Sequence, residues 1–351
     1  MPTIIDQVKL PKISILFFGT TDFSATVLTA LATTQGFTVV GVVTQPDRPV
    51  GRSKKITPPP VKVTAKKLGL PIWQPESLKR DSSIPPRQGA PLGMTEKRHA
   101  LPGADIFVVF AYGLIIPQAI LDLPPYGAIN IHPSLLPKYR GPTPVQTAII
   151  KGDTETGVSL ILLDEQMDHG TILSQLKMPI DPNDTTETLT SKLVTAATPL
   201  LVQTIQDWIH QKITPTPQDD SQATYCKMLT RDDGRVNWSQ SAREIYNLYR
   251  GLTPWPGIWT MQENKRLKLL RIVIPNAAPE RSRGGGVEES LSASSRQALS
   301  PGMIRVKDRR IFIGCGDDSV EILELQREGK KAVSAEEFSR GYKNFDGAKL
   351  I

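Results

Sequence analysis

The sequence predicts an α/β domain with a mostly parallel sheet, followed by a smaller β-barrel domain. Through roughly the first 210 residues, short apolar runs alternate with helical segments, which is typical of βαβ units and a parallel sheet. Beyond residue 222 the apolar runs become shorter and are separated by turn residues, which is typical of a small barrel. At 351 residues the chain is long enough for two domains with separate cores.

Apolar runs and helical patterns define the elements of the first domain. Strands are expected at residues 13–18, 37–43, 106–111, 127–131 and 157–163. A helical pattern begins at Asp22, and further helices are expected at 60–68 and 185–210, the last of which opens with a Thr-Thr-Glu capping signal. The turn at residues 19–22 is not G-x-G-x-x-G and no Walker lysine follows it, which argues against a dinucleotide cofactor.

The boundary between the domains is predicted at residues 212–222, which carry two prolines and show no periodicity. The prediction is therefore a first domain at 1–211, a linker at 212–222 and a second domain at 223–351. In the second domain a helix is expected at 241–250, with strands at 267–274, 303–306, 310–314 and 320–325. Two stretches, 81–102 and 280–298, fit no element, and the second has the composition of a disordered loop.

Charge and composition narrow the class of protein. From residue 226 onward 22 Lys and Arg face 16 Asp and Glu, whereas residues 1–225 hold 20 and 19. A basic second domain suits a polyanionic partner, although a charge that serves only solubility explains the excess equally well.

No apolar run approaches the ~20 residues that span a bilayer, and the N-terminus lacks a signal-peptide layout. Cys226 and Cys315 lack metal-ligand spacing, so a cytoplasmic protein with reduced thiols, no metal and no membrane contact is expected.

The clearest candidate for chemistry lies at the end of the strand predicted at 127–131. Asn130 and His132 are two residues apart, so their side chains share one face of the strand. Pro133 favours an extended backbone at His132, which supports this arrangement. A carboxamide beside an imidazole can hold a developing oxyanion and exchange a proton near neutral pH. Without other evidence, a polar strand end with a structural histidine would be the better explanation of this pair.

The residues that follow carry a family resemblance. Asn-Ile-His-Pro-Ser-Leu-Leu-Pro at 130–137, with Gly141, resembles the signature of the folate-dependent formyltransferases. Phe-Gly-Thr-Thr-Asp-Phe at 18–23, the run at 44–55 and Pro-Trp-Pro at 254–256 extend the resemblance over roughly residues 12–350 to the tRNA-directed branch, the methionyl-tRNA formyltransferases. The resemblance implies a Rossmann-like first domain and an OB-like barrel. It also implies formyl transfer from 10-formyltetrahydrofolate to initiator methionyl-tRNA, and we expect a monomer.

The resemblance also assigns roles to individual residues. It maps Asp168 onto the family's catalytic aspartate, beside Asn130 and His132, although an Asp that precedes a Gly, taken alone, is more often a turn residue. It implies folate contacts from Gly113, Leu114, Ser134, Leu135, Leu136 and Pro137. Residues 51–55 are too polar to pack and are expected to form an exposed, mobile loop, which without the resemblance would be explained as an ordinary solvated basic loop. The resemblance implies contacts with the tRNA acceptor arm from Arg48, Arg52, Lys54 and Lys55. The family usually has a small residue where this chain has His169. This imidazole could perturb local proton transfer or simply face water, and the second is expected.

Two other functions remain possible at this point. A sister formyltransferase could act on glycinamide ribonucleotide or on an amino-sugar nucleotide; the first type is shorter and lacks the basic second domain. The second type shares residues 137–141 and 254–257 but lacks the basic run at 44–55. The second alternative is a non-catalytic nucleic-acid binder built on the barrel, and the set of Asn130, His132 and Asp168 argues against it.

Overall fold

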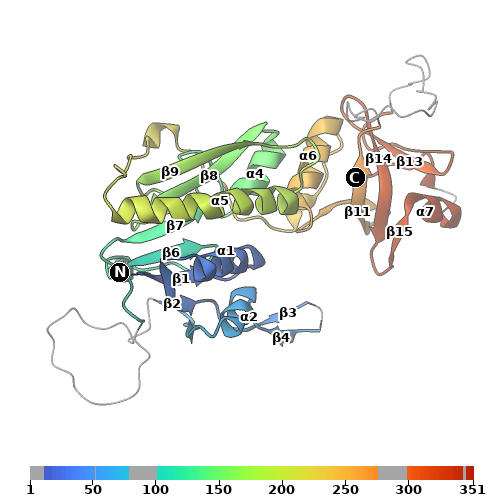
Figure 1. Cartoon of the computed structure of the whole chain (residues 1–351). Helices are drawn as coiled ribbons and strands as arrows, with labels where there is room; N and C mark the ends of the chain where they lie inside the picture. The colour runs from blue at the N-terminus through green and yellow to red at the C-terminus, as the bar shows by residue number, and fades with distance from the viewer. Residues whose placement is uncertain (1–11, 52, 79–100, 276–298, 343–344) are drawn as a thin grey trace, which may run out of the picture. The chain divides into compact units, whose positions relative to one another are not determined.

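The structure is a computed structural model that describes residues 12–51, 53–78, 101–275, 299–342 and 345–351 (Figure 1). Internal packing divides the chain into two compact units. Unit 1 comprises Met1–Gly141, Glu155–Pro179 and Thr190–Tyr225, and unit 2 comprises Pro142–Thr154, Ile180–Leu189 and Cys226–Ile351. Of the two stretches that fit no predicted element, 280–298 and most of 81–102 lie outside the described residues.

Unit 1 is built around a seven-stranded sheet in the order β5-β2-β1-β6-β7-β8-β9. The pairs from β5 to β7 are parallel, and β8 and β9 join antiparallel. The predicted mostly parallel α/β sheet is thus confirmed, and the strand expected at 157–163 is present but runs antiparallel to its neighbours. The strands are β1 (Ile13–Gly19), β2 (Phe37–Val43), β5 (Ile72–Trp73), β6 (Ile106–Phe110), β7 (Ala128–His132), β8 (Glu155–Leu162) and β9 (Ile172–Pro179).

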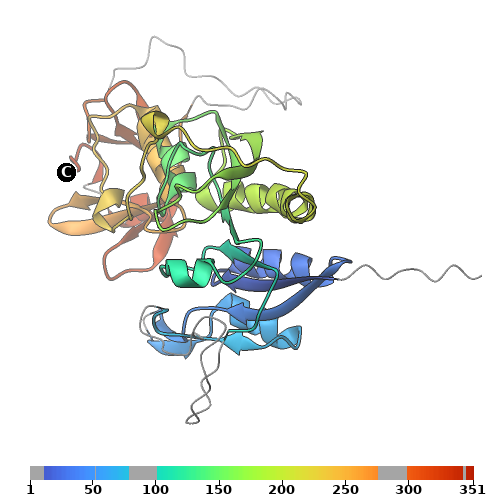
Figure 2. The same ribbon diagram turned by 90° about the vertical axis from the view of Figure 1, so that its left-hand side faces the viewer.

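The central strands of this sheet are buried because helices cover them. All five residues of β6 are buried, which accounts for its continuous apolar run. Helix α1 begins where Thr21 accepts a hydrogen bond from the backbone N–H of Ser24. Figures 1 and 2 both show the unit 1 part of α5 lying along one face of the sheet. The helices with residues in unit 1 are α1 (Asp22–Thr33), α2 (Pro60–Lys67), α3 (Gln118–Leu121) and α5 (Thr186–Ile209), with a 3-10 turn η1 (Asp220–Gln222).

The basic segment after β2 forms a small hairpin. Strand β3 (Arg48–Val50) pairs antiparallel with β4 (Lys55–Thr57), and all residues of both strands are exposed. The exposure expected at residues 51–55 is confirmed for those that the structure describes, and their mobility stays a prediction. The flanking strands β3 and β4 were not predicted. Residues directly opposite each other in an antiparallel pair share a face. Val50 and Lys55 therefore lie on one face, and Pro49 and Ile56 on the other.

Unit 2 contains a six-stranded antiparallel sheet, in which β10-β11-β14-β13-β12 follow one another and β15 pairs with β14. Backbone hydrogen bonds join the C-terminal residues to both outer strands, since Ile351 pairs with Met261 and Ile304 donates to Ala348. The predicted β domain is confirmed, and its OB-like topology stays a prediction. The strands are β10 (Ile258–Gln262), β11 (Lys265–Val273), β12 (Ile304–Lys307), β13 (Arg310–Gly314), β14 (Ser319–Arg327) and β15 (Ala332–Ser334). Helices α4 (Pro144–Lys151), α6 (Ala242–Leu252) and α7 (Ala335–Gly341) and the 3-10 turn η2 (Asp232–Gly234) complete it.

Residues 212–222, which the sequence predicts as a linker, are hydrogen-bonded within unit 1. Thr216 and Ile172 of β9 exchange two backbone hydrogen bonds of 2.9 and 2.8 Å. The boundary between unit 1 and unit 2 in this part of the chain lies further along, between Tyr225 and Cys226. The domain limits of 1–211 and 223–351 stay predictions. This segment is nonetheless an ordered part of the first unit, and it contributes to the site described next.

Candidate active site

The three residues predicted to be catalytic lie together at one end of β7. Asn130 and His132 are on this strand, between β6 and β8, and the connection from β8 to β9 carries Asp168. Asp168 Oδ1 lies 3.5 Å from Asn130 Nδ2 and 3.4 Å from His132 Nδ1. Residues separated by 38 positions in the sequence thus form one polar cluster. The His132 ring is almost fully buried, so its polar contacts are shielded from water.

The backbone of Asp168 adopts an unusual conformation that its neighbours hold in place. Its φ is +51°, a left-handed value that costs most residues roughly 1–2 kcal/mol but that Asp tolerates better than most. The Gly141 N–H donates to Asp168 Oδ2 at 2.8 Å, and Gln218 Nε2 donates to the carbonyl oxygens of Asp168 and Gly170 at 2.9 and 2.8 Å. A Cβ at Gly170 would lie 1.6 Å from the Leu162 carbonyl oxygen, so only glycine permits this course of the loop.

The surroundings of Asp168 favour its charged form. Burial raises the pKa of this carboxyl, but the hydrogen bond and charge of His132, the Gly141 N–H and the charge of Arg140 together lower it further than burial raises it. The net result is a pKa below the usual value for Asp. Asp168 is therefore an ionised acceptor at neutral pH, which suits a residue that orients a histidine.

Both ring nitrogens of His132 face oxygen acceptors of the protein. Nε2 lies 2.9 Å from the Tyr139 carbonyl oxygen, and Nδ1 faces the Asp168 carboxylate. In this arrangement both ring nitrogens are occupied by acceptors of the protein. The Asn130 side chain, by contrast, makes one long hydrogen bond to the residues that the structure describes, and a carboxamide has two N–H groups. Of the two predicted oxyanion donors, Asn130 has the more available donor.

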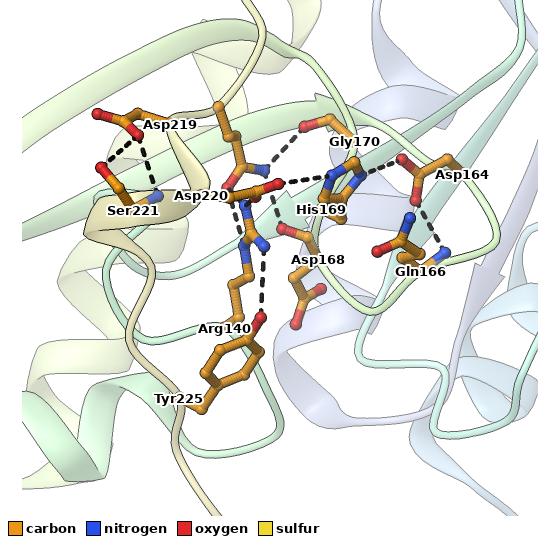
Figure 3. A network of polar contacts seen from close by, with 11 residues as sticks. Arg140, Asp164, Gln166, Asp168, His169, Gly170, Asp219, Asp220, Ser221 and Tyr225 are labelled. Atoms are coloured by element: carbon orange, nitrogen blue, oxygen red, sulfur yellow. Dashed lines mark hydrogen bonds and ion pairs between the residues drawn. The ribbon is translucent and has the colours of Figure 1, made fainter.

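A buried arginine that sequence reasoning did not assign to the site joins it to the segment at 212–225 (Figure 3). Arg140 is 3 % exposed. Its guanidinium donates to Gln218 Oε1 at 3.1 and 2.9 Å and to Asp220 Oδ1 at 2.7 Å, and Nη1 lies 3.5 Å from the Tyr225 hydroxyl. Burial lowers the pKa of Arg140, and the hydrogen bonds and charges of Asp220 and Tyr225 raise it above the usual value. Arg140 lies between the two parts of the signature, residues 130–137 and Gly141, and this position could have marked it as a site residue. Its hydrogen-bond partners could not be inferred from sequence spacing.

The residue after Asp168 does not simply face water. His169 Nδ1 lies 2.6 Å from Asp164 Oδ2, and Nε2 lies 3.5 Å from Asp220 Oδ2 (Figure 3). The expectation that this imidazole is merely solvated is wrong. The hydrogen bond to Asp164 raises the pKa of His169 above its ordinary value, and the charges of Asp164 and Asp220 add to this effect.

The predicted folate loop at 134–137 is held by β8 and β9. The Ser134 hydroxyl donates to the Lys138 carbonyl at 2.6 Å, and the Leu136 side chain is buried. Leu135 packs over Gly157 of β8, where a Cβ would lie 2.5 Å from its Cδ2. Gln175 of β9 donates to the Leu136 carbonyl at 2.9 Å. The loop that contains Pro137 is therefore firmly positioned, and its contacts with folate stay predictions.

The backbone at Gly113 is closely approached by a side chain, and its predicted contact with folate stays a prediction. Its φ is +81°, and a Cβ would lie 2.4 Å from Gln45 Nε2. The same Gln45 amide donates to the Tyr112 carbonyl at 2.9 Å. The side chain that approaches Gly113 thus comes from the protein itself. Beside it, Leu114 is partly buried and Ile115 is 68 % exposed.

Of the predicted tRNA-contacting residues, Arg48, Lys54 and Lys55 lie on the β3–β4 hairpin. Arg48 forms an ion pair of 2.8 Å with Glu76, and both side chains are largely exposed. Lys54 and Lys55 are exposed, and Lys54 has a left-handed φ of +50° at the turn. Arg52 lies outside the described residues. The hairpin therefore presents at least two lysines to solvent.

In the part of the chain that the structure describes, no group of three or more His, Cys, Asp or Glu side chains is arranged to hold a metal ion. None of the helices described is long and apolar enough to cross a membrane.

Comparison with solved structures supports the fold. A sugar 3N-formyl transferase, described in the presence of dTDP and 5-N-formyl-THF, aligns with a TM-score of 0.59 at 17% identity, covering 91% of this chain and 99% of the other. An N-formyltransferase from Helicobacter canadensis, in complex with folinic acid and dTDP-3-aminofucose, aligns with a TM-score of 0.59 at 17% identity, covering 88% and 98%. At such identities the likeness concerns the fold alone.

Sequence comparison is more specific. Residues 11–205 match the family described as formyl transferase, and residues 228–343 match the formyl transferase C-terminal domain. A protein from Dehalococcoides mccartyi named methionyl-tRNA formyltransferase is 41% identical over 97% of this chain and 99% of its own length. A protein of the same name from Listeria monocytogenes is 39% identical, over 93% of this chain and 95% of its own length. The chain therefore belongs to the methionyl-tRNA formyltransferase family of formyl transferases.

Proposed function

We propose that this enzyme transfers the formyl group of 10-formyltetrahydrofolate to the free amine of methionine on initiator tRNA. The observation that carries the proposal is the cluster of Asn130, His132 and Asp168 at the end of β7. An amide donor can stabilise the oxyanion of acyl transfer to an amine, and a buried imidazole with an ionised carboxylate can assist the proton transfer. The names of the relatives support the same acceptor. Because that acceptor is a substrate of translation, the proposal includes a cytoplasmic location.

Each residue of the cluster has a role in this reaction. The methionine amine attacks the formyl carbon, the bond from that carbon to N10 breaks, and one proton passes from the amine to N10. Asn130 donates a hydrogen bond to the oxyanion that forms, and the His132 ring adds a second donor if it turns from the Tyr139 carbonyl. Asp168 orients His132 and holds a water that relays the proton. No metal ion is part of the proposal.

The proposed folate surface lies next to this cluster in the sequence and on neighbouring strands. The backbone at Gly113 and Leu114 follows β6, and the loop at 134–137 follows β7, which pairs with β6. The carboxyl ends of neighbouring parallel strands meet at one edge of a sheet, which is where α/β folds bind ligands. The exposed Ile115 offers apolar surface at this edge for a flat ring.

The direct test is incubation of the purified protein with methionyl-tRNA and 10-formyltetrahydrofolate, with detection of N-formylmethionine after deacylation. We expect formylated product with initiator methionyl-tRNA. Parallel reactions with glycinamide ribonucleotide and with an amino-sugar nucleotide test the sister activities. Product from either of these, with none from methionyl-tRNA, would overturn the proposed acceptor.

The hairpin should contribute to tRNA binding through charge. Replacing Lys54 and Lys55 together by Ala removes two exposed cations without disturbing a buried contact. Each lost phosphate contact lowers the slope of log affinity against log salt by about one, so we expect weaker tRNA binding with a shallower slope and unchanged folate binding. A filter-binding salt titration measures this.

Lys177→Ala, at an exposed lysine paired with Glu155, is the control and should bind tRNA normally. An unchanged salt slope in the double variant would exclude the hairpin as a phosphate contact.

A further inference from the structure

The imidazole of His169 joins two segments that are far apart in the sequence. Asp164 belongs to the connection between β8 and β9, and Asp220 belongs to η1. His169 lies between them, at 2.6 Å from one carboxylate and 3.5 Å from the other, with its side chain 31 % exposed (Figure 3). An imidazole can satisfy two carboxylates only when both ring nitrogens carry protons. The bridge therefore requires the imidazolium form.

The bridge reaches the candidate catalytic carboxylate by a short series of contacts. Asp220 accepts a hydrogen bond from Arg140 at 2.7 Å, and Arg140 donates to Gln218. Gln218 in turn holds the carbonyl oxygens on both sides of His169, those of Asp168 and Gly170. The loop that carries Asp168 is thus tied to residues 218–220 twice, once through Gln218 and once through His169.

We propose that His169 is a positioning residue whose imidazolium ties the Asp168 loop to η1 and so keeps the Asp168 carboxylate against Asn130, His132 and the Gly141 N–H. The left-handed backbone at Asp168 makes such support necessary, because the conformation is intrinsically unfavourable and persists only where the surroundings enforce it. His169 touches no reacting atom in this proposal. Its contribution to turnover rests on the proposed function, whereas its effect on the loop does not.

The bridge should depend on pH. The charged groups that face His169 are Asp164 from its own loop, Asp220 from η1 and Arg140 from the connection after β7. The hydrogen bond to Asp164 and the charges of both carboxylates raise the pKa of His169 more than burial and the charge of Arg140 lower it. This pKa therefore lies above its ordinary value of 6.5. A group whose pKa is raised by folding stabilises the folded arrangement fully below its ordinary pKa and loses this effect as pH rises through the raised value. The bridge should therefore hold Asp168 less firmly as pH rises through the raised pKa of His169.

Two substitutions separate the charge of His169 from its shape. His169→Gln keeps a hydrogen-bonding side chain without charge, and His169→Arg keeps a cation at every pH of interest. We expect kcat of the Gln variant to fall roughly three- to tenfold at pH 6.5, with little change in the KM for methionyl-tRNA. The Arg variant should recover activity and retain it at alkaline pH where the wild type declines. His210→Gln, at an exposed histidine bonded only to the Gln206 carbonyl among the described contacts, is the matched control.

A measurement that needs no turnover tests the same proposal. The Gly141 amide donates to Asp168 Oδ2, so its NMR chemical shift reports the position of this carboxylate. We expect the Gly141 signal of the wild type to titrate with the midpoint of His169, and this step to disappear in His169→Gln. If the wild type makes no formylmethionine, the proposed function fails, and the NMR titration still tests the bridge. A Gly141 titration and a kcat–pH profile that are identical in wild type and His169→Gln would overturn the proposal.

Discussion

Asp168→Asn is expected to lower kcat by about a hundredfold or more while the fold stays intact. Asparagine has nearly the shape of aspartate, tolerates the left-handed backbone at this position and can still accept the hydrogen bond from Gly141. What it lacks is the negative charge that faces His132 Nδ1. Without that charge, His132 Nδ1 loses its carboxylate partner, the ring is held less firmly, and proton transfer slows. Steady-state formylation of methionyl-tRNA under saturating folate measures the loss.

The fold of this variant can be checked separately. Its thermal unfolding should stay cooperative, because the core residues of unit 1 are untouched. Asp122→Asn, at an exposed carboxylate that accepts a hydrogen bond from Gln118 on α3, is the matched control and should turn over normally. If Asp168→Asn retained more than about half of the wild-type kcat, a catalytic role for this carboxylate would have to be abandoned.

Asn130→Ala is expected to produce a loss of similar size for a different reason. Removing one oxyanion donor typically costs about 3 kcal/mol of transition-state stabilisation, or about a hundredfold in rate. Because this hydrogen bond strengthens only as charge develops on the oxygen, kcat should fall while KM changes little. Both ring nitrogens of His132 are engaged by Tyr139 and Asp168, so His132 cannot readily replace the lost donor.

Single-turnover kinetics with pre-bound methionyl-tRNA separate this effect from product release. Gln118→Ala, which removes an exposed carboxamide on α3, is the control. The double variant Asn130→Ala, Asp168→Asn should lose less than the product of the two single losses, because the two side chains belong to one cluster. An Asn130→Ala enzyme with raised KM and normal kcat would show that Asn130 binds substrate instead of stabilising the oxyanion.

Much of the fold follows from local patterns. The apolar runs at 13–18, 37–43 and 106–111 became β1, β2 and β6, because a strand buried on both faces needs a continuous apolar sequence. The direction of β8 did not follow, since apolarity is the same whichever way a strand runs. The β3–β4 hairpin was also missed, because its short strands are fully exposed and show no hydrophobic alternation.

By itself the sequence determined the family, the two-domain plan and the pairing of Asn130 with His132, because each of these depends on neighbouring residues. Motifs are contiguous, and side chains two apart on a strand share a face whatever surrounds them. Only the tertiary structure decided that Asp168 meets this pair and that Arg140, His169 and residues 218–220 support it. These contacts join β7, the β8–β9 connection and η1, and their geometry depends on how the whole sheet packs, which no local pattern encodes.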